Sequence, residues 1–349
     1  MPSATQEVHP LDDADRALIE ALQVSPRASW AAVGEVLALD PVTVARRWKR
    51  LSAEGVAWVT AYPAPDAYGT AALVDIAVAP RDLDAVAAAI AADPHVFTLE
   101  RTTGAHSLTA IVGAVDLGDL TANCLDRIER IAGVRAVEIH LATRIFLEAS
   151  RWRMRGLTPG QVARLKQIAP PPAASGSHGS PAGDDLDTRI RAVLVADGRA
   201  GGADVAAALG IGVHTARRRL DRLLGSGRLV FRCDVAQAYT GWPICATFRA
   251  AVAPAKVVAT AQTLSTLPEI RMCMATTGPH NLHISVWLHA VDDVHRLENL
   301  LADRLPDLRI ADRVVVLRPY KSSGRTLGPT GRALPAPGSA TEGGPVSFG

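Results

Sequence analysis

The chain has few of the features on which secreted, metal-binding or membrane proteins depend. Only 4 of its 349 residues are cysteine, and none lies in a Cys-x-x-Cys or other metal-ligand spacing, so we expect buried, reduced thiols. No window approaches the ~18 apolar residues of a membrane helix, and the N-terminus lacks a basic region followed by an apolar run. These absences predict a cytoplasmic protein with no membrane association.

Aromatic residues and net charge are also scarce. Phe, Trp and Tyr make up 4% of the chain, which limits the surface available for stacking on nucleic-acid bases. The 37 Lys and Arg against 35 Asp and Glu leave a net charge of only +2. The field of the whole molecule therefore does not indicate a polyanionic partner, and a nucleic-acid signal has to come from local clustering.

Catalytic and metal-binding motifs are missing as well. The sequence contains no GxSxG, HExxH or P-loop, and no GxGxxG in the expected setting. His280 and His283 fall near each other, but in a strand they point to opposite faces, which argues against a shared metal site. We therefore expect no catalytic residue, no metal and no cofactor.

What the chain does have is a basic helical stretch that occurs twice. Residues 40–55 align without a gap with residues 212–227, at a shift of 172 positions (Arg199 minus Arg27). Val44, Trp48 and Leu51 form an apolar stripe at helical spacing, while the arginines fall on the opposite side. A basic run alone is usually a solvated face. Two copies with the same polar residues at the same offsets favour a functional face instead.

The surrounding pattern predicts an α+β fold in which one two-domain unit is repeated. Two short amphipathic helices precede each basic helix, which is typical of a helix-turn-helix, winged-helix-like unit with a β-prone exit segment. The order βαββαβ then follows, as in ferredoxin-like domains. The open sheet face of each such domain needs a cover, and a second sheet would provide it. We predict these domains: helix-turn-helix at 8–62, ferredoxin-like at 68–150, helix-turn-helix at 184–238, and ferredoxin-like at 240–322.

Two segments have compositions that predict little or irregular structure. Residues 151–183 combine a basic short helix, capped at Thr158, with a Pro/Gly/Ser-rich linker. Residues 323–349 are rich in Gly, Pro, Ser and Thr, and we expect them to be a disordered tail.

These motifs together resemble the Lrp/AsnC family of bacterial and archaeal transcription regulators, in tandem duplicated form. The residues that carry the resemblance are LDDADRALIEAL at 11–22, RRWKRL at 46–51, RRRLDRL at 217–223, Gly55, Gly227, TTGAHSL at 102–108 and TTGPHNL at 276–282. The resemblance implies double-stranded DNA as a partner and a covalently linked pseudo-dimer. It also implies a small effector such as an amino acid near the Thr-Gly turns, and a homo-oligomer assembled through the ferredoxin-like sheets.

DNA contacts are predicted on the two basic helices. Their arginines can neutralise phosphates, and those on the outer face can reach base edges in the major groove. Val42 in the first copy is replaced by His214 in the second, so we expect an imperfect palindrome with half-sites about 34 Å, or a multiple, apart. The predicted DNA-binding residues are Thr43, Arg46, Arg47, Lys49, Arg50, His214, Thr215, Arg217, Arg218, Arg219 and Arg222.

The Thr-Gly turns allow two interpretations. Glycine serves either a tight strand connection with positive φ or the close approach of a ligand to backbone amides. Family turns commonly end in Asp where this chain has Ser107 and Asn281, which removes a charged partner for an amino-acid ammonium group. The residues of the predicted effector site are Thr103, Gly104, His106, Ser107, Thr277, Gly278, His280 and Asn281.

Two other functions fit the same architecture. One is an effector-sensing or assembly protein whose helices do not bind DNA. The other is an enzyme similar to siroheme decarboxylases, which are built from related units. The Asn-His-Asn-Tyr-type signature expected before the central strands of such an enzyme is absent from residues 93–104, and the arginine-rich helices would be unexplained. We therefore predict a sequence-specific regulator, and no enzyme.

Overall fold

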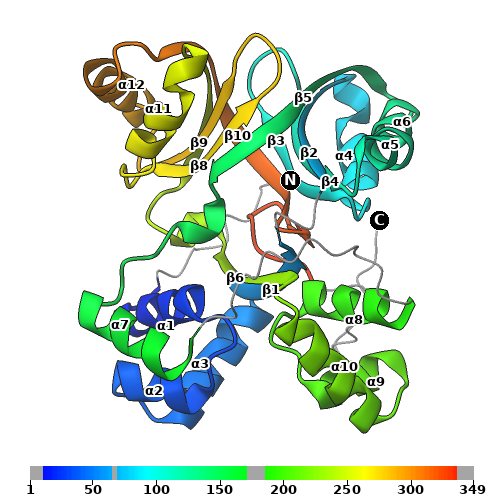
Figure 1. The fold of residues 1–349 in the computed structure, drawn as a ribbon, viewed down its shortest axis with the longest axis vertical. Helices are drawn as coiled ribbons and strands as arrows, with labels where there is room; N and C mark the ends of the chain where they lie inside the picture. Colours follow the sequence, from blue (N-terminus) through cyan, green and yellow to red (C-terminus); the bar gives the residue numbers. More distant parts are fainter. Residues whose placement is uncertain (1–10, 65–68, 171–184, 336–349) are drawn as a thin grey trace, which may run out of the picture.

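A computed structural model describes residues 11–64, 69–170 and 185–335, and it shows two layers (Figure 1). The two helix-turn-helix units lie side by side in the lower layer, and the two ferredoxin-like domains form the upper layer. The predicted α+β class, with both modules present twice, is confirmed.

The first helix-turn-helix unit begins at the described N-terminus, and its helices start where side-chain caps are available. Asp12, Ser29 and Asp40 each accept a hydrogen bond from a backbone N–H in the first turn of the helix that follows. Val44 and Leu51 are fully buried, as the apolar stripe predicts. The elements are α1 (Asp13–Val24), α2 (Trp30–Leu37), α3 (Pro41–Ala53) and the exit strand β1 (Ala57–Pro63).

The second unit repeats this arrangement with weaker caps. Gly201 and Gly212 occupy the N-cap positions of its second and third helices and offer no side-chain oxygen. Ala216, Leu220 and Leu223 bury the stripe of the third helix. The elements are α8 (Asp185–Ala196), α9 (Gly202–Leu209), α10 (Val213–Gly225) and β6 (Leu229–Val235).

Each ferredoxin-like domain covers the outer face of its sheet with helices, and its apolar core lies between those helices and the sheet. A π turn at 121–125 divides the expected second helix of the first domain into two short α-helices. The first domain contains β2 (Thr70–Val78), α4 (Leu83–Ala91), β3 (Val96–Thr102), β4 (Leu108–Ala114), α5 (Leu117–Leu120), α6 (Asp126–Glu129) and β5 (Val134–Leu147). The second contains β7 (Ile244–Ala251), α11 (Val257–Leu264), β8 (Ile270–Thr276), β9 (Leu282–Leu288), α12 (Asp293–Arg304) and β10 (Arg309–Ser322).

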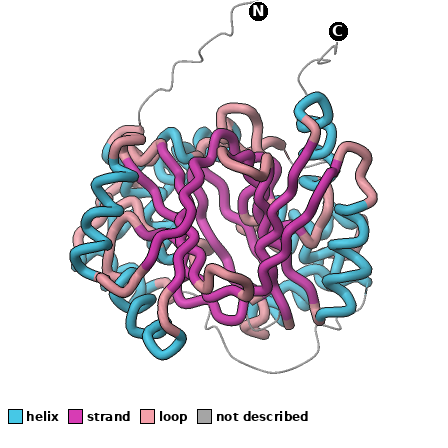
Figure 2. The backbone as a smooth tube through the Cα atoms, turned by 90° about the horizontal axis from the view of Figure 1, so that it is seen from above, coloured by secondary structure: helices cyan, strands magenta, loops and turns pink. Residues whose placement is uncertain are grey.

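The two sheets are joined by their longest strands. The first half of β5 pairs with β2 in its own domain and the second half with β8, while β10 pairs first with β7 and then with β3. The order β10-β3-β4-β2-β5-β8-β9-β7 therefore closes on itself, and Figure 2 shows the strands between two outer groups of helices. The inner sheet faces cover one another within one chain. This pairing within one chain agrees with the covalently linked pseudo-dimer that the resemblance implies, and assembly into a homo-oligomer stays a prediction.

The exit strands of the two helix-turn-helix units form a separate two-stranded antiparallel ribbon. Seven residues of β1 pair with seven of β6, from Ala57 opposite Val235 to Pro63 opposite Leu229, with Thr60 opposite Arg232 at the centre. Because Thr60 and Arg232 are equivalent at the shift of 172, this centre lies on the pseudo-two-fold axis that relates the units.

The basic short helix predicted within 151–183 is present with its cap at Thr158, and one predicted boundary is corrected by packing. The short helix in the predicted linker, α7 (Pro159–Ile168), packs on α1 and α2, because Leu165 is fully buried there and the Gln161 side-chain amide donates to the Val36 carbonyl at 3.0 Å. Residues 323–335, predicted as part of a disordered tail, also fold back. They form β11 (Arg325–Thr326), bury Leu327 in the first helix-turn-helix core, and donate from the Ala333 N–H to the Gly55 carbonyl. The rest of that tail (336–349) and linker residues 171–184 lie outside the described residues.

Candidate DNA-binding face and inter-sheet cavity

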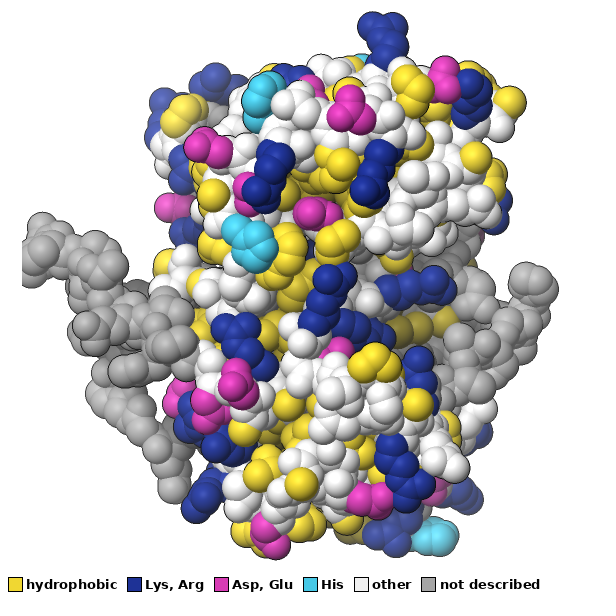
Figure 3. Space-filling model, turned by 90° about the vertical axis from the view of Figure 1, so that its left-hand side faces the viewer, with side chains coloured by type: hydrophobic (Ala, Val, Ile, Leu, Met, Phe, Trp, Pro, Cys, Tyr) yellow, Lys and Arg dark blue, Asp and Glu magenta, His cyan; other side chains and the backbone are white. Residues whose placement is uncertain are grey.

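The basic helices α3 and α10 lie in the lower layer of the molecule (Figure 1). Arg46 and Arg218, which are equivalent residues, are both exposed. Figure 3 shows Lys and Arg side chains spread over one side of the molecule, several of them at this lower end. Of the other predicted DNA-binding residues, Lys49, Arg50, His214, Arg217 and Arg222 are exposed, and Thr43, Arg47, Thr215 and Arg219 are half-buried.

Four of these arginines also join the basic helix to the first helix of the same unit. Arg47 Nη1 lies 2.9 Å from Asp15 Oδ1, and Arg50 Nη2 lies 2.5 Å from Asp15 Oδ2. Asp187, the equivalent of Asp15, accepts in the same way from two further arginines. Both carboxylates are buried, with side chains 4% and 6% exposed. This second pair is Arg219, 3.0 Å from Asp187, and Arg222, 2.6 Å from Asp187. The four arginines therefore fix the geometry of each helix-turn-helix unit.

The two units differ at one exposed position of the basic helix. Lys49 in α3 corresponds to Asp221 in α10, and both are exposed. A cation near a DNA phosphate attracts it and a carboxylate repels it, so the two faces are unequal in charge as well as in shape. The sequence alone indicated unequal faces from Val42 and His214, and Asp221 is a further difference.

A reciprocal arginine contact fixes the two units to each other. Arg27 donates to the carbonyls of Gly198 and Ala200 in the second unit, the latter at 3.1 Å. Arg199 donates to the carbonyls of Pro26 at 2.6 Å and Ala28 at 2.8 Å in the first. The Arg199 guanidinium also stacks 3.8 Å from the Trp30 ring centroid. Together with the β1–β6 ribbon, this contact holds the two basic helices at one separation.

The Thr-Gly turns connect the two ferredoxin-like domains. Thr103 donates its N–H to the Val315 carbonyl at 3.0 Å and accepts from the Val315 N–H at its Oγ1 at 2.9 Å. Thr277 makes the same pair of bonds with Leu141, both at 2.9 Å. Each turn is thus attached to the long strand of the other domain.

The glycines of these turns have the conformation that the tight-connection interpretation requires. Gly104 has φ +96° and Gly278 has φ +102°. A Cβ at Gly278 would lie 2.8 Å from His140 Nδ1, and one at Gly104 would lie 3.2 Å from a Val314 methyl group. Both positive φ and close packing therefore account for glycine at these positions.

The remaining predicted effector residues lie around the same turns. Asn281 holds its loop by accepting from the Val252 N–H at 3.0 Å and donating to the Val252 carbonyl at 2.8 Å. Ser107 donates to the Val78 carbonyl at 3.4 Å, and His106 Nε2 lies 3.8 Å from Glu138. His280 accepts at its carbonyl from the Thr276 hydroxyl. The structure brings each set of four together in its own turn, and the two sets remain at separate turns.

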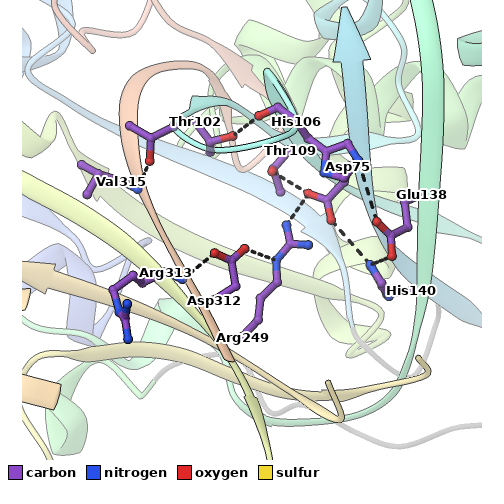
Figure 4. Close-up of polar contacts among 11 residues, drawn as sticks. Asp75, Thr102, His106, Thr109, Glu138, His140, Arg249, Asp312, Arg313 and Val315 are labelled. Atoms are coloured by element: carbon purple, nitrogen blue, oxygen red, sulfur yellow. Dashed lines mark hydrogen bonds and ion pairs between the residues drawn. The ribbon is translucent and has the colours of Figure 1, made fainter. Parts of the chain in front are cut away.

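A buried polar network lies between the sheets near the turns (Figure 4). Asp75 is completely buried and accepts from Thr109 Oγ1 at 2.8 Å and from Arg249 Nη2 at 2.6 Å, while His140 Nε2 lies 3.6 Å away. Although burial opposes ionisation, the nearby His140 imidazole and the Arg249 charge hold the pKa of Asp75 at about 2. Burial beside Arg249 lowers the pKa of His283 to about 4. At neutral pH the network therefore contains a carboxylate, a guanidinium and the neutral imidazole of His283.

A cavity of about 350 Å³ lies between the two sheets and above the β1–β6 ribbon. Strands of both ferredoxin-like domains line it, and so do Tyr62 and Pro63 of β1 and Arg232 of β6. None of the eight predicted effector residues is part of the lining. The lining residues with a charged or imidazole side chain are Glu100, Arg144, Glu148, Arg232, Arg271 and His283.

These cavity residues were not among those predicted from the sequence. Arg271 and Glu100 lie in strands read as ordinary half-buried strands, so alternation alone gave them no special weight. The available signal was a charged residue inside an otherwise apolar run, as in EIRMCMAT and RLVFRCDV. Such residues point inward only when a second sheet covers the first, and this arrangement depends on tertiary structure.

Among the described residues there is no helix long and apolar enough to cross a membrane, and no group of three or more His, Cys, Asp or Glu that could hold a metal ion. The four cysteines, Cys124, Cys233, Cys245 and Cys273, are buried.

Comparisons with known proteins bear on both modules. Residues 11–52 match the AsnC-type helix-turn-helix domain, and residues 71–152 match the Lrp/AsnC ligand binding domain. An HTH-type transcriptional regulator of Pyrococcus furiosus is 32% identical over 123 residues, which are 35% of this chain and 81% of that protein. A regulator of Pyrococcus abyssi is 30% identical over 138 residues, 39% of this chain and 87% of that protein. The chain belongs to the Lrp/AsnC family. It is an HTH-type transcription regulator with a ligand-binding domain.

One solved structure extends the likeness at the level of the fold over most of the chain. The siroheme decarboxylase NirDL has a TM-score of 0.56 at 12% identity, covering 89% of this chain and 93% of that one. The leucine response regulatory protein of Mycobacterium tuberculosis has a TM-score of 0.36 at 25% identity, covering 41% of this chain and 99% of that one. At 12% identity, the similarity to NirDL concerns the arrangement of the elements alone.

Proposed function

We propose that this Lrp/AsnC family member binds double-stranded DNA in a sequence-specific way through α3 and α10 and that a small-molecule effector controls this binding. The observation that supports it is the pair Arg46 and Arg218. They are exposed at equivalent positions of two helices that the reciprocal Arg27 and Arg199 contacts hold at one separation. Arginines placed in this way can reach base edges in two successive major grooves.

The differences between the helices support an imperfect palindrome as the operator. His214 and Asp221 in α10 stand where α3 has Val42 and Lys49. The half-site read by α3 would attract phosphates more strongly, and the second half-site would depend more on its base contacts. We place the protein in the cytoplasm, where genomic DNA is accessible in bacteria and archaea.

The test is a double variant, Arg46→Ala with Arg218→Ala, assayed by mobility shift on DNA fragments recovered with the wild-type protein from its host. We expect weaker binding and a shallower dependence of affinity on salt, because two phosphate-side or base-edge cations are lost. The matched control is Arg130→Ala with Arg304→Ala, which removes two equivalently placed arginines from helix ends in the ferredoxin-like layer. Equal binding by both double variants would refute the DNA-binding assignment.

Two places are candidates for the effector site: the Thr-Gly turns and the inter-sheet cavity. The Thr-Gly turns were predicted from the sequence, with an amino acid as ligand, but Thr103 and Thr277 are already hydrogen bonded to the opposite domain. A ligand there would have to use the remaining groups of the turn, such as His106 and His280. If substitution of either histidine by Gln removes an effector response while DNA binding is retained, the turn site is supported.

A siroheme-decarboxylase-like activity is the second candidate function, and the observation that favours it is the shared arrangement of elements with NirDL over 89% of the chain. The protein purified from its host should then carry the absorbance of a bound tetrapyrrole and should consume siroheme. Absence of both, together with salt-dependent binding to specific fragments, would leave the regulator function.

A further inference from the structure

The inter-sheet cavity touches both layers of the molecule. Its walls come from β2, β3, β4, β5, β7, β8, β9 and β10 of the ferredoxin-like domains, and Tyr62 and Arg232 reach it from the ribbon that continues into the helix-turn-helix units. A volume of about 350 Å³ lies within the range of small-molecule sites in proteins. A molecule in this cavity would therefore contact the ribbon directly.

Arg271 shares its nearest carboxylate with Arg232, which Glu148 also faces. Asp234 Oδ1 lies 2.6 Å from Arg232 Nη2 and 3.5 Å from Arg271 Nη2, so one carboxylate serves two guanidinium groups. The Arg271 guanidinium stacks 3.6 Å from the Trp287 ring centroid, and its side chain is 11% exposed. Buried charges are normally paired, which leaves room at Arg271 for an anionic partner.

Glu100 also lacks a partner on the cavity wall. Its side chain makes no hydrogen bond or ion pair with any residue in the described part of the chain, and burial raises its pKa to about 7 despite the nearby Arg271 charge. When Glu100 is protonated it is a hydrogen-bond donor without charge. His283 on the opposite wall is 4% exposed and has a buried Nδ1 with no partner among the described residues. These groups are available to polar atoms of a ligand.

The remaining wall is largely apolar. Side chains of Leu73, Phe97, Ile111 and Met272 line the space between the polar groups. An inorganic anion would leave these side chains uncovered, whereas an organic molecule with an apolar body would bury them.

We propose that the inter-sheet cavity is an effector site for a small organic carboxylate with an apolar body, with the carboxylate bound at Arg271. This inference rests on the proposed function, because it identifies the place and chemical class of the effector. It differs from the turn site in both location and ligand charge.

Occupancy would reach the DNA-binding layer through Asp234. A carboxylate at Arg271 takes over the role of Asp234 as the partner of that guanidinium and leaves Asp234 to Arg232. Asp234 lies in β6 opposite Trp58 of β1, two pairs from the centre of the ribbon that joins the two helix-turn-helix units. The expected consequence is a change in the packing of this ribbon and therefore in DNA affinity.

The test uses the full-length protein with benzoate as probe and benzamide as its neutral counterpart. Binding is followed by calorimetry and by the fluorescence of the tryptophans, of which Trp287 adjoins Arg271. We expect benzoate to bind and raise the melting temperature at pH 6, while benzamide binds at least tenfold more weakly. Benzoate binding should take up a proton between pH 6 and 8, because the added negative charge favours protonated Glu100.

Two variants make the test specific. Arg271→Gln should lose benzoate binding, with Arg81→Gln on the exposed surface as the control. Because Arg271 is buried and its variant could fail to fold, Glu100→Gln provides the second readout. This isosteric variant should bind benzoate without proton uptake and at least threefold more tightly than the wild type at pH 8. Equal affinity for benzoate and benzamide, or unchanged proton uptake in Glu100→Gln, would overturn the proposal.

The outcomes separate this inference from the proposed function. DNA binding is measured by mobility shift with and without benzoate. Benzoate binding without any DNA binding would leave the cavity site intact and refute the regulator function. DNA binding by a protein that does not respond to benzoate would support the regulator function and refute the cavity site. Binding of iron-uroporphyrin, followed by its absorbance and abolished in Arg271→Gln, would assign the cavity to a tetrapyrrole and overturn the proposal of a small acid.

Discussion

Arg27 and Arg199 each donate to backbone carbonyls of the other helix-turn-helix unit, and they are equivalent residues in the two repeats. Burial lowers the pKa of Arg199 to about 10, which still leaves it charged at neutral pH. The acceptors are backbone carbonyls of the other unit. The contact therefore fixes the relative position of the two units without requiring a particular side chain in the other unit.

The first prediction concerns operator spacing. In the double variant Arg27→Ala with Arg199→Ala, the two units should remain joined only by the ribbon and neighbouring contacts. We expect the melting temperature to fall, with a loss of roughly 2 kcal/mol for each arginine, since hydrogen bonds from charged groups contribute about that much. The variant should also tolerate operators whose half-sites are moved apart by one or two base pairs. Mobility shifts on a series of such operators measure this. A spacing preference identical to that of the wild type would show that the ribbon alone sets the separation.

A second prediction concerns the unequal charge of the two DNA-facing helices. Asp221→Lys should strengthen binding to nonspecific DNA and steepen the slope of log affinity against log salt by about one, because one more phosphate is neutralised. Lys49→Asp should have the opposite effect. Affinity is measured by fluorescence anisotropy at several salt concentrations. Unchanged slopes in both variants would place these residues away from the DNA.

The third prediction tests the buried carboxylate at the base of the first unit. Asp15→Ala should lower the free energy of unfolding by about 1–3 kcal/mol, because it removes the buried carboxylate that accepts from both Arg47 and Arg50. Asp13→Ala, an exposed change on the same helix, is the control and should be close to neutral. Chemical denaturation followed by circular dichroism gives both values. A similar loss of free energy of unfolding in both variants would mean that Asp15 stabilises the unit only through its negative charge near the N-terminus of α1.

The fourth prediction follows from the raised pKa of Glu100. A carboxyl group whose pKa is higher in the folded than in the unfolded protein stabilises the fold when protonated. Its contribution is complete below its ordinary value of 4.5 and is lost as the pH rises through about 7. In Glu100→Gln this part of the pH dependence should disappear, a difference of roughly 1–3 kcal/mol between pH 5 and pH 8. Melting temperatures across that range, without ligand, provide the measurement. If the melting temperatures of the variant and the wild type changed in parallel with pH, the raised pKa of Glu100 would be contradicted.

Local pattern was enough to predict the repeated modules. The stripe of Val44, Trp48 and Leu51 appears in the structure as expected, because it depends on residues within one or two turns. The exchange of β5 and β10 between sheets was not predicted. Each reads simply as a long strand, and its second partner lies in the other repeat.

The errors at the domain boundaries have a similar cause. Composition made residues 323–335 look unstructured, yet Leu327 and Ala333 find apolar and hydrogen-bonding partners around Gly55. The same holds for the candidate site. Arg46 and Arg218 could be proposed from spacing, whereas Arg271 and Glu100 gain their importance only when two sheets face each other.

The ion pair between Asp75 and Arg249 has a consequence for how such a chain could arise. The two residues occupy the same position of the two repeats, 174 residues apart, as do Gly104 and Gly278. Two separate copies of the first repeat would place aspartate facing aspartate in a buried site, and two copies of the second would place arginine facing arginine. Like charges at this depth strongly oppose association. In a single chain that carries both repeats, each half has to match only the other half, and this ion pair makes the two halves complementary in charge.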